Sequence, residues 1–179
     1  MTTDQIAESN VGPKASVSDI LLDGLFAGMI GALVVAAWFL VLDLVGGRPL
    51  WTPAMLGSLL LHGTGAVQHV VVRPLEVAAY TAFHFLVFIA VGVALSFLMT
   101  LFDRFPIMFF VLLVLFLCLQ AGFFVLDAIL GAELMHQLRP WAVVIANVLA
   151  AGAMALYLWR RHPDVLRRVE QLWQEEEPS

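Results

Sequence analysis

Four stretches of the sequence are long enough to cross a lipid bilayer and contain almost no charged residue. A membrane-spanning helix needs about 20 mainly apolar residues, because the hydrocarbon core of a bilayer is about 30 Å thick. We expect these spans at about 20–45, 76–102, 105–131 and 140–161. Together they leave room only for tails and short connections, so the sequence predicts an integral membrane protein.

The composition supports a membrane location and excludes several other classes of protein. Hydrophobic residues make up 61% of the 179 residues and charged residues only 13%, whereas soluble domains are about 45–50% apolar and about 25% charged. The formal net charge of −5 offers no basic surface, so we expect no nucleic-acid partner. The single cysteine excludes an internal disulfide.

The prolines and the shortest connection indicate how the spans are arranged. The eight prolines lie at or outside the boundaries of the expected spans, because proline starts helices well and interrupts them badly. The turn between the second and third spans is only about four residues long, at Asp103–Pro106, so these two helices must form an antiparallel hairpin. The expected fold class is therefore all-α: an integral membrane four-helix bundle with up-down-up-down connectivity.

The connection between the first two spans contains a short helix of its own. Thr52 and Pro53 are typical of a helix start, with Thr52 as the N-cap and Pro53 at the first helical position. The apolar segment 54–62 follows, and Gly63 is typical of a helix stop. At about ten residues this helix is too short to span. We expect it to be an outer interfacial helix or to lie against the bundle.

Two tails flank the four-span transmembrane domain, which we place at 19–161. Residues 1–18 are expected to form a flexible N-terminal tail. Residues 162–179 are expected to form a C-terminal cytoplasmic tail that contains an amphipathic helix, because its apolar residues share one helical face. That face consists of Val165, Leu166, Val169, Leu172 and Trp173.

The distribution of lysine and arginine predicts the orientation in the membrane. With four spans, both termini and the connection between spans two and three lie on one side. That side carries Lys14, Arg104, Arg160, Arg161, Arg167 and Arg168, and the opposite side carries Arg48, Arg73 and Arg139. Because basic residues are enriched on the cytoplasmic side, we expect a multi-pass protein with both termini cytoplasmic. The pattern is typical of short proteins of the bacterial inner (plasma) membrane.

Polar residues are concentrated in the outer halves of the expected spans. In the first span, Asp43 follows a stripe of small residues that we expect to face the bundle: Gly24, Gly28, Ala32 and Ala36. The inner halves contain little beyond Ser96 and Thr100. The candidate ligand-binding residues therefore converge on the outer half: Asp43, Tyr80, His84, Gln120, Asp127 and Asn147.

This polar cluster has two interpretations. An ionisable group inside a membrane costs about 3 kcal/mol or more unless it is paired, so such a group is a functional hypothesis by default. His84 with Asp43 or Asp127 could form a site that holds a metal, relays protons or binds a polar head such as a quinone ring. Alternatively, the cluster is a structural hydrogen-bond network that fixes the register of the helices.

The known cofactor patterns are incomplete in this sequence. Glu133 and His136 have the Glu-x-x-His spacing of di-iron bundles, but those bundles need two such pairs and two further glutamates. A bis-histidine haem would need a second histidine on another span, at the depth of His84, and there is none. The sequence thus requires no cofactor, with haem or a metal as alternatives. We find no catalytic motif of the familiar hydrolases or nucleotide-binding enzymes.

Two functions follow from these patterns. The first is a non-enzymatic membrane protein that acts as an accessory or partner-binding subunit of a membrane assembly. Its partners would be the lipid bilayer and either another membrane protein or further copies of the same chain. The second is a small-ligand, metal or proton site in the outer half of the bundle, serving transport or redox chemistry.

Overall fold

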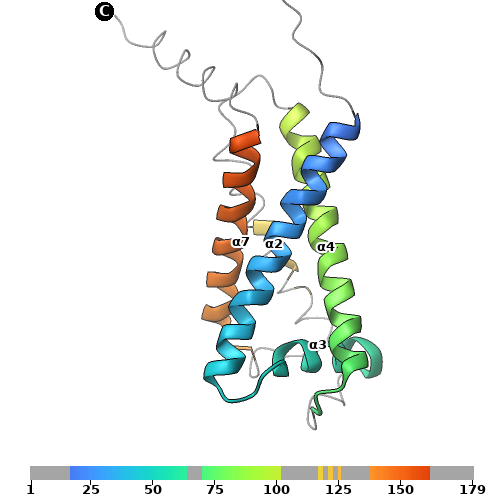
Figure 1. The fold of residues 1–179 in the computed structure, drawn as a ribbon, viewed down its shortest axis with the longest axis vertical. Coiled ribbons are helices and arrows are strands. Elements are labelled where there is room, and N and C mark those ends of the chain that lie inside the picture. The colour runs from blue at the N-terminus through green and yellow to red at the C-terminus, as the bar shows by residue number, and fades with distance from the viewer. Residues whose placement is uncertain are drawn as a thin grey trace, which may run out of the picture.

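The computed structural model describes residues 17–63, 70–101, 117–118, 121–122, 125 and 138–161. Within this part of the chain the secondary structure is helical and contains no strand, which confirms the expected all-α class. The elements are α2 (Val17–Val45), α3 (Trp51–His62), α4 (Pro74–Leu101) and α7 (Pro140–Arg161), shown in Figure 1.

Three of these helices are long and apolar enough to cross a membrane: Val17–Val45, Pro74–Phe97 and Pro140–Arg161. They correspond to the first, second and fourth expected spans, and α2 begins three residues earlier than expected. Most of the expected third span, 105–131, lies outside the described residues. The tail 162–179 with its amphipathic helix lies outside them as well.

The long helix α2 runs antiparallel to both of its neighbours (Figure 1). The start of α2 meets the end of α7, where Arg161 Nε donates to Asp23 Oδ1 at 3.0 Å. Farther along α2, Trp38 Nε1 donates to the carbonyl oxygen of Ala142 near the start of α7, also at 3.0 Å. On the other side, α2 packs along much of α4. It follows that α4 and α7 run parallel to each other.

Glycines allow α2 and α4 to approach each other closely. Gly24 and Gly28 of α2 lie directly against the backbone of α4, on either side of Gly92. A Cβ atom at Gly28 would lie only 2.6 Å from the Cα atom of Ile89. Small residues permit this kind of backbone contact between membrane helices, where van der Waals packing drives association.

The small-residue stripe in α2 faces the bundle as expected only in part. Gly24, Gly28 and Ala32 are buried, but Ala36 is exposed. A four-residue repeat turns by about 40° per step around a helix with 3.6 residues per turn, so the stripe drifts away from the contact. Asp43 is buried because it lies eleven residues after Ala32, close to three full turns.

The short helix α3 lies across the start of α4 and packs against it (Figure 1). Of the two expected locations, the structure shows the one against the bundle. Gly57 touches the backbone of Glu76 in the first turn of α4. A small apolar cluster joins α3 to the start of α7: Met55, Leu56, Leu59, Leu138 and Val143. A larger core lies between α2, α4 and α7 and includes Phe88, Ala150 and Met154.

The two ends of α3 differ in how well the sequence predicted them. Gly63 ends the helix as expected, with φ at 80° and its N–H donating to the carbonyl oxygen of Leu59 at 2.9 Å. The expected N-cap at Thr52 is wrong, because the helix begins at Trp51 and the N-cap residue is Leu50, in the left-handed region at φ 61°. Thr52 lies inside the first turn, and its side chain bonds to Asp43 instead.

Replacing Gly28 by alanine tests the close contact between α2 and α4. We expect Gly28→Ala to destabilise the protein by about 1–3 kcal/mol, because the methyl group would collide with the backbone of α4. The matched control is Gly152→Ala in α7, where a Cβ meets nothing within 4 Å. It should be neutral or slightly stabilising, since alanine is the better helix former. Thermal unfolding in detergent measures both, and equal melting temperatures would contradict the contact.

Candidate functional site

The Asp43 side chain holds the start of α3. The Thr52 backbone N–H donates to Asp43 Oδ2 at 2.7 Å, and Thr52 Oγ1 donates to Asp43 Oδ1 at 2.7 Å. Both side chains are buried, with 7% of Asp43 and 5% of Thr52 exposed. The turn between them is fixed by Arg48, whose N–H donates to the Asp43 carbonyl oxygen at 2.8 Å. The Arg48 guanidinium also stacks 4.3 Å from the ring centroid of Trp51.

Asp43 therefore acts as a capping group supplied by the preceding helix. The first N–H groups of a helix have no partner within the helix, and a carboxylate there also interacts favourably with the helix dipole. The two hydrogen bonds from Thr52 therefore offset the cost of burying the Asp43 carboxylate. Both carboxylate oxygens of Asp43 accept hydrogen bonds that hold α3 against the end of α2.

His84 lies between α4 and α2, near the middle of α2. Its Nε2 is 3.2 Å from the carbonyl oxygen of Ala32. Because a carbonyl oxygen only accepts hydrogen bonds, this contact requires a proton on Nε2, and in the neutral imidazole Nδ1 is then an acceptor. The imidazole is surrounded by aromatic rings, with centroid distances of 5.6 Å to Tyr80, 6.0 Å to Phe85 and 4.7 Å to Phe88.

Tyr80 connects the imidazole to α3. Its ring stacks on His84 with an interplanar angle of 30°, one helical turn closer to the start of α4. The same ring packs, partly buried, against the cluster that includes Met55 and Leu59 of α3. Tyr80 and His84 are thus brought together as the sequence predicted.

The structure separates His84 from Asp43. The partner of His84 is Ala32, and Asp43 lies eleven residues farther along α2, about 16 Å along the helix axis. Each side chain has its own partner, so the two form no direct pair. Asn147 is buried on α7. Gln120 and Asp127 lie outside the described residues, as do the candidate metal ligands Glu133 and His136.

A cavity of about 330 Å³ lies between α2, α4 and the start of α3. Ligand pockets measure about 300–1,000 Å³ and combine apolar walls with a few polar groups, and this cavity fits that description. The walls are mainly apolar side chains from within 33–40 of α2 and 77–85 of α4. The polar lining residues are Thr52, Tyr80, Thr81 and His84.

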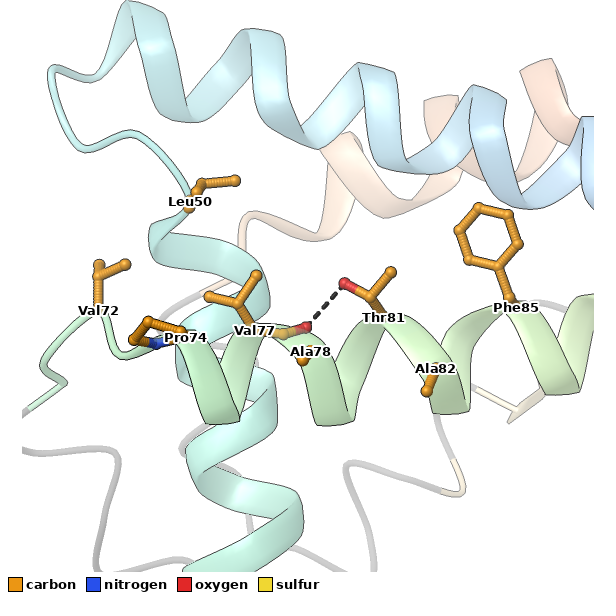
Figure 2. Close-up of a pocket in the computed structure, with 8 residues that line it drawn as sticks. All are labelled: Leu50, Val72, Pro74, Val77, Ala78, Thr81, Ala82 and Phe85. Atoms are coloured by element: carbon orange, nitrogen blue, oxygen red, sulfur yellow. Dashed lines mark hydrogen bonds between the residues drawn. The ribbon is translucent and has the colours of Figure 1, made fainter.

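A more open groove of about 640 Å³ lies along the first turns of α4, next to Leu50 (Figure 2). It shares four lining residues with the cavity: Leu50, Val77, Thr81 and Phe85. Figure 2 shows Thr81 bonded back to its own helix, with Oγ1 donating to the carbonyl oxygen of Val77 at 2.7 Å. The Thr52 hydroxyl proton is likewise used by Asp43. Tyr80 and His84 are therefore the lining residues best able to hydrogen-bond a bound molecule.

The structure contains two polar contacts that were not predicted from the sequence. Glu76 is 2% exposed, and its Oε1 lies 3.5 Å from His62 Nε2 and 3.5 Å from Arg73 Nη1. Its Oε2 is buried and has no hydrogen-bond partner among the described residues. At the opposite end of the bundle, buried Asp23 pairs with Arg161. One sign of this pair was visible in the sequence: Asp23 and Arg161 both lie at the inner ends of their expected spans.

No group of three or more histidine, cysteine, aspartate or glutamate side chains suited to a metal ion occurs within the part of the chain that the structure describes. Comparisons with protein-family models, with curated proteins and with solved structures found no match.

The bond between Asp43 and Thr52 is tested by removing one hydroxyl. We expect Thr52→Val to destabilise the protein by about 1–3 kcal/mol, because it leaves a buried carboxylate oxygen without a partner. Thr81→Val is the control, since the Thr81 hydroxyl is exposed and bonds only within its own helix. Its melting temperature should stay close to that of the unchanged protein. A loss as large for Thr81→Val as for Thr52→Val would contradict the proposed role of Asp43.

Proposed function

We propose that the chain forms a bundle of four membrane spans with up-down-up-down connectivity. The support comes from the directions of the described helices: α4 and α7 run parallel, so the end of α4 and the start of α7 lie at opposite ends of the bundle. The chain between them must return across the same thickness. Residues 117–118, 121–122 and 125, which belong to the expected third span, are helical.

The proposed orientation places both termini in the cytoplasm of a bacterial cell and α3 on the outer side of the inner membrane. The support is the excess of lysine and arginine on the side of the termini. In a Cys118→Ser background, which removes the one native cysteine, a membrane-impermeant maleimide should label Val71→Cys in intact cells. It should leave Arg160→Cys unlabelled until the membrane is opened. Both positions are exposed. The opposite labelling pattern would reverse the orientation.

The function that the geometry supports best is the binding of a small membrane-soluble molecule, without catalysis, in the cavity between α2, α3 and α4. One observation carries this proposal: an apolar cavity contains an imidazole and a phenol next to each other inside the membrane-spanning region. Among the described residues His84 is bonded only through Nε2, so in the neutral imidazole Nδ1 can accept a hydrogen bond from a ligand. The role as an accessory subunit of a membrane assembly stays a prediction from the sequence.

Filling the cavity tests this function. The protein is purified in a mild detergent, and the organic extract is analysed by mass spectrometry for a small molecule that is retained near one per chain. Ala36 lines the cavity, so Ala36→Leu should reduce the retained amount several-fold. Ala94→Leu is the control, because Ala94 is an exposed alanine of α4 that lines neither the cavity nor the groove. Equal recovery from both variants would contradict binding in the cavity.

A further inference from the structure

We propose that the molecule bound in the cavity is an uncharged amphiphile whose head is a ring of the quinone or quinol class. The inference deepens the proposed function, because it names the class of ligand and rests on the cavity being a binding site. Three features of the described residues lead to it: the absence of charge, the arrangement of hydrogen-bonding groups and the shape of the apolar surface.

The lining of the cavity excludes charged heads. None of the lining residues is an aspartate, glutamate, lysine or arginine. The nearest carboxylate of α2, Asp43, is bonded through both oxygens to Thr52. An anionic head would lose its hydration in the cavity without meeting a cation, and a cationic head would meet no carboxylate there. An unpaired buried charge of either sign is strongly unfavourable. The head must therefore be neutral.

The two hydrogen-bonding groups match a quinone ring in both redox states. The Nε2–H of His84 is bound to the Ala32 carbonyl, so Nδ1 accepts. A quinol hydroxyl can donate to that nitrogen, and a quinone oxygen cannot. The Tyr80 hydroxyl can donate to a quinone oxygen or accept from a quinol. Both groups lie on one face of α4, one helical turn apart, and both line the cavity.

The walls of the site suit a flat ring with an apolar tail. His84 lies among Tyr80, Phe85 and Phe88, and aromatic rings favour stacked or edge-on contact with another ring. The groove of about 640 Å³ continues from the cavity along α4 through Val77 and Phe85, and its lining is almost entirely apolar (Figure 2). It offers a path for a hydrocarbon tail between the cavity and the lipid.

The experiment measures binding of a benzoquinone with a decyl tail, and of its reduced quinol, to the full chain in detergent by calorimetric titration. Tyr80→Phe should weaken binding of both forms by about fivefold to tenfold, the usual effect of one lost hydrogen bond. His84→Phe should weaken the quinol more than the quinone, because only the quinol donates to Nδ1. Tyr157→Phe, which changes the only other tyrosine and lies outside the cavity, should bind like the unchanged protein.

Decanoate combines a similar tail with a carboxylate head. It tests the ligand class separately from the proposal that the cavity is a binding site. We expect it to displace the quinone only weakly. If decanoate competes as well as the quinol, or if Tyr80→Phe and Tyr157→Phe bind alike, the quinone class is wrong. If neither probe binds but a different molecule is retained and is lost in Ala36→Leu, the class is wrong and the cavity stays a binding site. If no molecule is retained and neither probe binds, both proposals fail.

Discussion

The close contact between α2 and α4 is the constraint on which the rest of the structure depends. Gly24 and Gly28 bring the two backbones together on either side of Gly92, and this closeness fixes which residues face each other farther along the pair. It allows the imidazole of His84 to reach a backbone carbonyl of α2. Toward α3 the glycines end, larger side chains line both helices, and the cavity lies between them.

Acidic side chains at the ends of the helices hold the elements in place. Asp43 joins the end of α2 to the start of α3, Glu76 lies where α3 crosses α4, and Asp23 joins the start of α2 to the end of α7. An acid near the membrane is costly unless it is paired, and Asp43 and Asp23 are directly bonded to their partners. His84 differs from Asp43, because Thr52 engages both carboxylate oxygens of Asp43, whereas among the described residues only Nε2 of His84 has a hydrogen-bond partner.

The apolar pattern predicted the described spans well, since the thickness of the bilayer fixes the length of an apolar helix. Gly63 was predictable because a helix stop is a local property of the backbone. The start of α3 was not, because its capping carboxylate comes from the preceding helix and the local sequence at Thr52 looks like a complete signal by itself. Ala36 lines the cavity and is exposed, instead of lying in the close contact with α4, because a four-residue repeat drifts around the helix.

The candidate site was predictable only in outline. Tyr80 and His84 share a face at a spacing of four residues, which any helix brings together. The expected pair of His84 and Asp43 does not form. Counting residues from the ends of two helices gives the depth of each side chain, but it does not fix the register, which is how the helices are aligned along their axes. That register depends on the glycine contact, whose geometry the sequence does not contain. The roles of Glu76 and of the pair formed by Asp23 and Arg161 depend on the same long-range packing.

The measurement that tests this account most directly is nitrogen-15 NMR of the histidine side chains in lipid bilayers, with His84→Phe used to assign the His84 signals. We expect a neutral imidazole with the proton on Nε2, held by the Ala32 carbonyl. The signal of the unprotonated Nδ1 should move when the decyl quinol is added, while the Nε2 signal should change little. An imidazole protonated on Nδ1, or an Nδ1 signal that does not respond to bound quinol, would contradict it.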